Sequence, residues 1–168
     1  MVRIRRTTVE DLSRIETLLC KSYPATMVAA YDAAVLAAAL PFITKAQLDL
    51  LTSGTFYVAE EAGRILGCGG WTFGAPGSGQ ISEGLAHIRH FAVDPERARA
   101  GFGRLIFEEC ARAAHQAGAV RFQVFSSLNA ENFYARMGLQ RLDIVAVPIR
   151  EEVVFPAVLM EGPVTAAS

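Results

Sequence analysis

Cysteine is scarce in this sequence, and its three copies lie far apart. Cys20, Cys68 and Cys110 are odd in number, and no two of them form a C-x-x-C pair. Small secreted proteins that depend on disulfides carry a denser and usually even set. We therefore expect three reduced, mostly buried thiols in a cytoplasmic protein. The apolar patterns around Cys68 and Cys110 also argue against a cysteine nucleophile, because burial disfavours the thiolate.

The sequence has neither an excess of one charge nor a long apolar run. Sixteen basic residues stand against seventeen acidic ones, and the arginines are scattered along the chain, which argues against nucleic acid as the main partner. The apolar stretch at residues 25–40 contains Asp32 and is shorter than the ~20 residues of a membrane-spanning helix. The N-terminus also lacks the apolar segment of a signal peptide. We therefore expect no nucleic-acid partner and no membrane insertion.

The sequence also lacks a set of residues with the spacing of metal ligands. His87 and His90 form an H-x-x-H pair, but His115 is distant and no cysteine or carboxylate set completes a site. Zinc sites in proteins need three or four ligands at short, regular spacings. We therefore expect no metal.

The first third of the chain contains one strand pattern followed by helical patterns. The stretch VRIRRTT alternates as a strand does, and Thr8 with Asp11 resembles a capping box that begins a helix. Tyr23-Pro24 is expected to end this helix, and Pro41 to separate two further helices that reach Leu40 and span 44–51. These small-residue helices could form a lid.

The rest of the chain mixes strand and helix patterns without a repeat or a linker. The expected elements are a hairpin with its turn at 61–63, a strand at about 85–93, a helix that Gly118 ends, a strand at 120–127, a short helix near 129–137 and strands at 141–148 and 150–160. We predict that residues 1–168 form one α/β (α+β) domain around a mixed, mostly antiparallel sheet.

The stretch PERARAGFGRLIFEEC, residues 95–110, places two glycines at the start of an amphipathic helix. The first backbone N–H groups of a helix lack partners and bind anions well. Gly101 and Gly103 keep side chains away from a bulky phosphate, and Arg97, Arg99 and Arg104 add positive charge. A dinucleotide fingerprint needs a third glycine where Ile106 stands, and the Gly-Lys-Ser/Thr of an ATP-binding loop is missing. The motif therefore predicts a pyrophosphate site of another kind.

The strand before this motif is predicted to be interrupted. In a regular strand Leu85, Phe91 and Val93 would lie on one face, and Ile88 would lie on the other. Side chains alternate along a regular strand, so an extra residue near Arg89-His90 is needed to put all four on one face. The glycines at 67, 69 and 70 precede no helix, and we interpret them as a strand bulge or a close backbone approach rather than a phosphate loop.

The segments IRHFAVDPERARAGFGRLIFEECARAAHQAG and SSLNAENFYARMGL resemble the GNAT superfamily of acetyl-CoA-dependent N-acetyltransferases. The resemblance covers the whole strand and helix order, and it implies a central sheet of about seven strands with helices on both faces. It also implies a V-shaped cleft between strands 4 and 5, opened by a bulge. The acetyl-CoA loop of the family reads Q/R-x-x-G-x-G/A, and ARAGFG matches it at both glycines but has Ala98 at the first position.

The resemblance implies acetyl-CoA as co-substrate and assigns its contacts. Backbone groups of Phe91, Ala92 and Val93 would pair with the pantetheine arm. The remaining expected contacts are Arg99, Ala100, Gly101, Phe102, Gly103, Arg104, Asn129, Phe133 and Tyr134. Two of these have an ordinary alternative, because Phe133 suits the packing of a short helix and Asn129 suits an N-cap.

The catalytic candidates are Tyr134 and His87. Tyr134 stands where many family members carry the acid that protonates the leaving thiolate, and a tyrosine hydroxyl with a pKa near 10 suits a thiolate with a pKa near 8.5. His87 stands one residue before Ile88, where histone-type members carry a catalytic glutamate, and its imidazole suits proton removal near neutral pH. His90, Glu83 and water are alternative bases.

The resemblance thus implies transfer of an acetyl group to a primary amine of a small molecule or peptide, by direct attack in a ternary complex. The alternative is a non-catalytic module that binds acyl-CoA. The acceptor should be chosen by residues 23–51 and 74–83, and Arg89 either pairs with a substrate carboxylate or is a solvated strand residue. EEVVFPAVLM is expected to end as an edge strand in which Pro156 limits further pairing, and a homodimer is possible.

Overall fold

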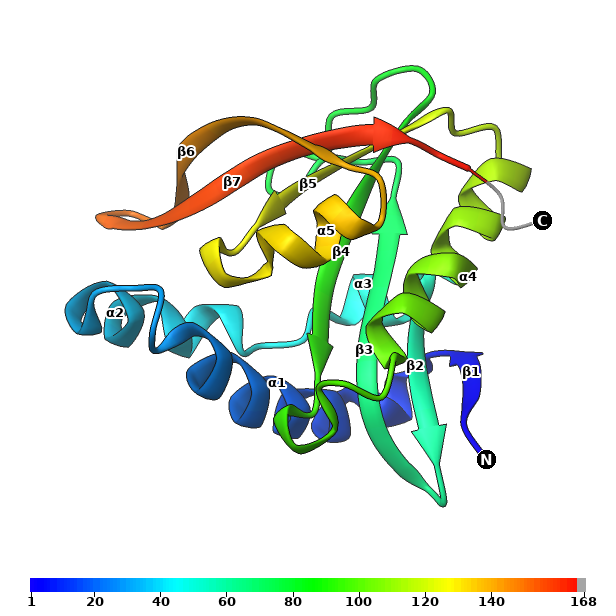
Figure 1. Cartoon of the computed structure of the whole chain (residues 1–168), viewed down its shortest axis with the longest axis horizontal. Helices are drawn as coiled ribbons and strands as arrows, with labels where there is room; N and C mark the ends of the chain where they lie inside the picture. Colours follow the sequence, from blue (N-terminus) through cyan, green and yellow to red (C-terminus); the bar gives the residue numbers. More distant parts are fainter. Residues whose placement is uncertain (166–168) are drawn as a thin grey trace.

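A seven-stranded mixed sheet forms the centre of the molecule (Figure 1). The structure, a computed structural model, describes residues 1–165. The strand order of the sheet is β1-β2-β3-β4-β5-β7-β6, and every neighbouring pair is antiparallel except β4 and β5. The elements in chain order are β1 (Arg3–Arg6), α1 (Leu12–Met27), α2 (Ala33–Ile43), α3 (Leu48–Leu51), β2 (Phe56–Glu61), β3 (Arg64–Thr72), β4 (Leu85–Val93), α4 (Phe102–Gln116), β5 (Arg121–Ser126), α5 (Glu131–Arg136), β6 (Gln140–Arg150) and β7 (Val153–Pro163). The predicted fold class is confirmed.

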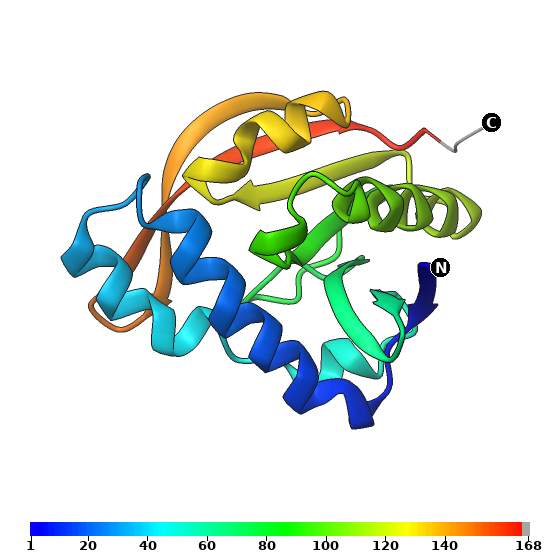
Figure 2. The same ribbon diagram turned by 60° about the horizontal axis from the view of Figure 1, so that its bottom comes forward.

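Helices cover both faces of the sheet and enclose two apolar cores (Figure 2). On one face α4 buries Ile106 and Cys110 against the central strands, and Tyr134 of α5 joins the same core. On the other face α1 and α2 bury side chains such as Ile15 and Leu36. Because α1 and α4 lie on opposite faces, a site that reaches both must pass through the sheet.

The two prolines expected to end or separate helices lie inside helices instead. Pro24 is within α1 and Pro41 is within α2, so these two predictions are wrong. A proline inside a helix removes one backbone hydrogen bond and weakens the helix by about 3 kcal/mol. In α1 the loss is offset by burial, because Tyr23 and Met27 on either side of Pro24 pack into the core. The break between the first two helices falls at residues 28–32.

The start of α1 is fixed by a buried carboxylate. Asp11 is 1% exposed and accepts a hydrogen bond from the backbone N–H of Thr8 at 2.9 Å, which confirms the predicted capping box. Arg5 of β1 donates to both carboxylate oxygens at 2.9 Å, and Arg14 donates at 2.7 Å. These hydrogen bonds hold the pKa of Asp11 at about 2.

The C-terminal hairpin differs from expectation in which strand is the edge. β7 lies between β5 and β6, and β6 is the edge strand. Pro156 pairs with Ala146 of β6, and β7 meets β5 only from Val158 onward. A proline is tolerated there because no strand on its other side requires its missing N–H. Among the helices of residues 1–165, none has the length and apolar character needed to cross a membrane.

Candidate active site

A cleft opens where β4 and β5 separate. These two parallel strands pair only over Leu85, Ala86 and His87 of β4 with residues 121–123 of β5. Beyond this short ladder lies a cavity of about 540 Å³. Its lining includes Gly103 of α4 on one face and Met27 of α1 on the other, so the cavity passes through the sheet.

A bulge in β4 accompanies this separation. Gly70 of β3 pairs with Arg89 and Cys68 pairs with Ala92, so two residues of β4 face one residue of β3. His90 has a φ of 50°, the left-handed region that non-glycine residues rarely adopt. The predicted bulge near Arg89-His90 is confirmed. It exposes the backbone edge of Phe91 to Val93 to the cavity, and all three residues line it.

The bulge is held by contacts from both neighbouring elements. The Tyr23 hydroxyl of α1 donates to the Phe91 carbonyl at 3.1 Å, and the Cys68 thiol donates to the His90 carbonyl at 3.3 Å. A side chain at Gly69 would lie 2.5 Å from the Phe91 ring, so this glycine leaves room for that ring; the register shift between Cys68 and Gly70 is the predicted strand irregularity. Burial raises the pKa of Cys68 to about 12, which keeps this thiol protonated.

The connection between β4 and α4 has the turn geometry expected of an anion site. Gly101 is the N-cap of α4 and has a φ of 83°, and Leu105 N–H makes the first helical hydrogen bond, to Gly101. The N–H groups of Phe102, Gly103 and Arg104 therefore have no partner within the helix. A Cβ at Gly103 would lie 3.1 Å from the Phe133 ring, and Gly103 lines the cavity.

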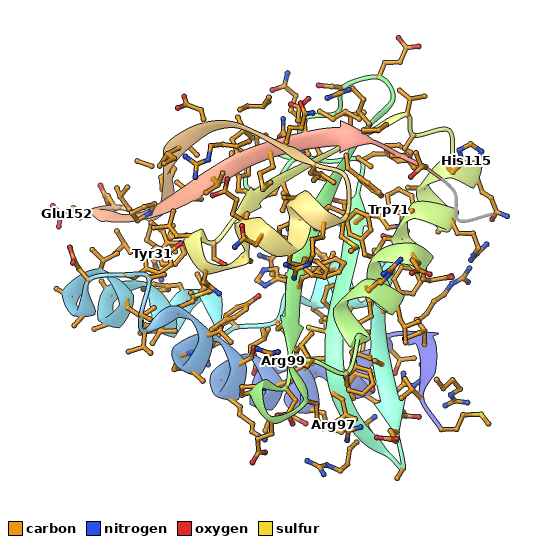
Figure 3. All side chains as sticks on the ribbon, in the orientation of Figure 1. Tyr31, Trp71, Arg97, Arg99, His115 and Glu152 are labelled. Carbon is orange, nitrogen blue, oxygen red and sulfur yellow. The ribbon has the colours of Figure 1, made fainter. Side chains whose placement is uncertain are left out.

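The three arginines near this turn have different partners. Arg97 pairs with Glu61 at 3.0 Å and stacks over the Phe102 ring, and Arg104 pairs with Glu108 at 3.0 Å. Arg99 is exposed and has no ion pair within residues 1–165. Figure 3 shows Arg97 and Arg99 on the connection before α4, with Arg97 toward the β2–β3 hairpin. Of the three, only Arg99 has no ion-pair partner in the described chain, and Ala98 lines the cavity with a small side chain.

Tyr134 brings a hydroxyl to the cavity from α5. The side chain is 5% exposed and its ring packs beside Phe91 and Phe133, with centroid distances of 6.1 and 5.1 Å. Its hydroxyl makes no hydrogen bond to the part of the chain described by the structure. Burial raises its pKa well above the usual value, so the group is a neutral donor at physiological pH.

Phe133 and Asn129 also line the cavity. Phe133 packs against Phe91, Phe107 and Tyr134, so the packing interpretation holds for this ring, which also contacts the turn at Gly103. Asn129 is not an N-cap: it lies inside a 3₁₀ turn (Leu128–Ala130) that Ser127 precedes, and it is exposed. The ordinary alternative for Asn129 is therefore wrong.

The candidate bases lie in different surroundings. His87 is 4% exposed within the paired part of β4, its Nε2 has no hydrogen-bond partner in residues 1–165, and it is not among the lining residues. Burial, and secondarily Arg89, lowers the pKa of His87. His90 does line the cavity, and the same two causes lower its pKa to about 4. Glu83 is exposed on the loop before β4 and outside the cavity.

Several lining residues were not singled out from the sequence. Residues 23–51 and 74–83 do contribute, through side chains such as Gln47 and Pro76, but β6 and β7 contribute as well. The lining residues from these two strands are Val147, Ile149, Phe155 and Ala157. Arg136 of α5 also lines the cavity, and its position two residues after Tyr134 was the available signal. The β6–β7 contribution left no local signal, because it depends on how this hairpin curves over the cleft.

Comparisons with known proteins agree with this geometry. The family described as "Acetyltransferase (GNAT) domain" matches residues 52–141. The PaiA N-acetyltransferase of Thermoplasma acidophilum, solved in complex with coenzyme A, is 14% identical over 97% of this chain and 99% of its own, with a TM-score of 0.73. A GCN5-related N-acetyltransferase of Rhodopseudomonas palustris is 18% identical over 96% and 94%, with a TM-score of 0.77.

A third similar structure is the ribosomal-protein-S18-alanine N-acetyltransferase of Escherichia coli. It is 15% identical over 100% of this chain and 97% of its own, with a TM-score of 0.66. At these identities the structures share the fold with this chain. A search of curated protein sequences found no significant match.

Proposed function

The chain belongs to the GNAT acetyltransferase family, and from that membership we propose that it is an N-acetyltransferase that uses acetyl-CoA. In the proposed reaction the nitrogen of a primary amine attacks the thioester carbonyl carbon directly, in a ternary complex. A carbon–nitrogen bond forms and the carbon–sulfur bond breaks. The amine gives up one proton, and the departing thiolate takes one up.

The turn before α4 supports the choice of acetyl-CoA. The free N–H groups of Phe102, Gly103 and Arg104 and the positive end of the helix dipole suit a pyrophosphate. A side chain at Gly103 would enter the space between the turn and Phe133. The exposed backbone of Phe91 to Val93 suits the amides of a pantetheine arm, since a strand edge offers both donors and acceptors.

Tyr134 is the proposed acid. Its hydroxyl is neutral, lines the cavity and has no competing partner in the described chain. A hydrogen bond from this group strengthens as negative charge gathers on sulfur, so it favours the transition state over the bound substrate. The neutral donor in a cavity that joins both faces of the sheet is the observation on which the proposal depends most.

His90 is the base candidate that the cavity favours, and His87 remains the base named from the sequence. With a pKa of about 4, His90 is neutral near pH 7 and can accept a proton from the amine directly or through water, but this pKa makes it a weak base, since a general base works best with a pKa near the operating pH. The buried ring of His87 would act only through an intervening group, because it does not line the cavity. Release of the proton to solvent is the third possibility.

Two measurements test the proposal. Calorimetric titration is expected to show binding of acetyl-CoA and no binding of NAD or ATP, and a thiol-release assay with a panel of primary amines is expected to show turnover. Binding without turnover of any amine would indicate a non-catalytic acyl-CoA-binding module. No binding of acetyl-CoA would refute the assignment of the turn at Gly101–Gly103.

A further inference from the structure

Arg89 is a half-buried cation that no carboxylate of the described chain neutralises. It leaves β4 one residue before the bulge, donates to the Thr72 hydroxyl at 3.0 Å and reaches the Gln47 side-chain oxygen at 3.3 Å. Both partners are neutral. Within residues 1–165 Arg89 has no ion pair, whereas Arg5 and Arg97, the other half-buried arginines, both pair with carboxylates.

Such a guanidinium lacks the counterion that its surroundings require. Taking a charge out of water is unfavourable unless an opposite charge or several hydrogen bonds replace the water. Arginine does not escape this penalty by losing its proton, although burial lowers the pKa of Arg89. Its planar fork matches a carboxylate in a two-point contact. The missing counterion would therefore come from a molecule that enters the cavity.

Arg89 lies on the acceptor side of the cleft. The residue before it, Ile88, packs in the core that contains α4, and side chains alternate along the strand. Arg89 points the other way, toward Gln47 between α2 and α3. The anion-binding turn of α4 is thus on the opposite face of the sheet. An anion at Arg89 would not be the pyrophosphate.

The rest of this side of the cavity is mostly apolar. Five side chains from α1, α2, β6 and β7 contribute to the lining, namely Met27, Ile43, Val147, Ile149 and Phe155. Such a wall favours an apolar group and makes a second charge on the ligand unfavourable. A ligand that satisfies both features has one carboxylate and an apolar side chain.

We propose that the acceptor amine carries a carboxylate, which Arg89 binds, together with an apolar side chain that packs on this wall. Arg89 is then the residue that sets acceptor specificity. This inference rests on the proposed N-acetyltransferase activity, because it names the substrate class of that same site. Free apolar amino acids and short peptides with an apolar C-terminal residue present the same chemistry.

Matched acids and amides test the inference. The thiol-release assay is run with L-leucine against L-leucinamide and with the dipeptide Gly-Leu against its C-terminal amide. With kcat/KM expressed per neutral amine, because a neighbouring carboxylate raises the pKa of the amine, at least one acid is expected to exceed its amide by about 10- to 100-fold, the effect of a hydrogen bond to a charged group. The amino-acid and dipeptide pairs show which of the two sources fits.

Variants separate carboxylate binding from a structural role. In Arg89→Gln the acid-over-amide ratio is expected to fall to near one, because the acid loses its two-point contact while the amide never had it. Arg89→Lys should keep part of the preference because it keeps the charge. Arg3→Gln removes an arginine of the edge strand β1, whose side chain is 68% exposed and lies outside the cavity, and should leave the ratio as in the wild type. An equal loss for acid and amide in Arg89→Gln would refute the inference and indicate a purely structural role.

A binding measurement keeps this test distinct from that of the activity. Calorimetry with CoA-loaded protein compares N-acetyl-leucine with N-acetyl-leucinamide. If no amine is acetylated but the acid still binds more tightly through Arg89, the carboxylate site stands and the proposed reaction fails. If amines are acetylated with no acid preference in either assay, the reaction stands and the inference fails.

Discussion

The variant Tyr134→Phe tests the proposed acid with little disturbance of the fold. The ring is 5% exposed and packs beside Phe91 and Phe133, and phenylalanine keeps that packing. The hydroxyl has no hydrogen-bond partner among residues 1–165, so its removal leaves no group unsatisfied. We expect the free energy of unfolding to change by less than about 0.5 kcal/mol.

Turnover should respond far more strongly than stability. General acid help is worth ~10² to 10⁴ in rate, which corresponds to about 3 to 5 kcal/mol of transition-state stabilisation. Because the hydrogen bond gains strength only as the thiolate forms, kcat should fall while KM for acetyl-CoA stays near the wild-type value. Burial raises the pKa of Tyr134 well above its usual value. The wild-type rate should therefore show no loss from ionisation of this group up to about pH 10.

The assay is steady-state thiol release with the best amine of the panel, combined with thermal unfolding of each variant. Tyr57→Phe is the matched control, because Tyr57 is 2% exposed and lies outside the cavity; its turnover should equal that of the wild type. Full kcat in Tyr134→Phe would refute the acid assignment. Loss of CoA binding or of the fold would instead show that the hydroxyl has a packing role that the contacts do not account for.

Three further predictions concern the turn, the base and the stability of the N-terminal region. Gly103→Val should reduce acetyl-CoA affinity by more than tenfold in calorimetry, about 1.4 kcal/mol, since even a Cβ at this position would lie 3.1 Å from the Phe133 ring; unchanged affinity would reject the turn as the binding site. His90→Ala should lower turnover mainly below the pKa of the acceptor amine, and the loss should shrink as pH rises. His87→Ala should leave turnover unchanged at these pH values. The reverse pattern would identify His87 as the base. The pKa of Asp11 is lowered to about 2 in the folded protein. The stability that it contributes is therefore present above its unfolded pKa of about 3.9 and is lost as pH falls toward 2. Urea unfolding should show a loss on the order of 2 kcal/mol across this pH range, and Asp11→Asn should remove the pH dependence.

The parts of the site that follow from local pattern were predictable from the sequence. The parity change between Ile88 and Phe91 indicated the bulge at His90, and the two glycines indicated the turn before α4. Both features are properties of a few consecutive residues, whose periodicity and conformational freedom are written in the sequence.

Features that depend on long-range packing were not predictable in the same way. Pro24 lies inside α1 because the burial of Tyr23 and Met27 outweighs a lost hydrogen bond, and no local rule contains that comparison. The absence of His87 from the cavity follows from its pairing with β5, a strand more than thirty residues later. The position of β6 at the edge is likewise set by which strands pair, not by the composition of the hairpin.

The short ladder between β4 and β5 has a mechanical consequence. Only three residue pairs, between β4 and β5, join strands β1–β4 to strands β5–β7. The two halves of the sheet are therefore weakly connected to each other. Far from this ladder, Tyr31 fastens them: its hydroxyl donates to the Pro156 carbonyl at 2.7 Å and accepts from Leu128 N–H at 2.9 Å, while its ring stacks on Phe155. Tyr31, which precedes α2, therefore ties the two halves together alongside the packing of α2 on β6 and β7, and a substitution there would alter the width of the cleft without touching any reacting group.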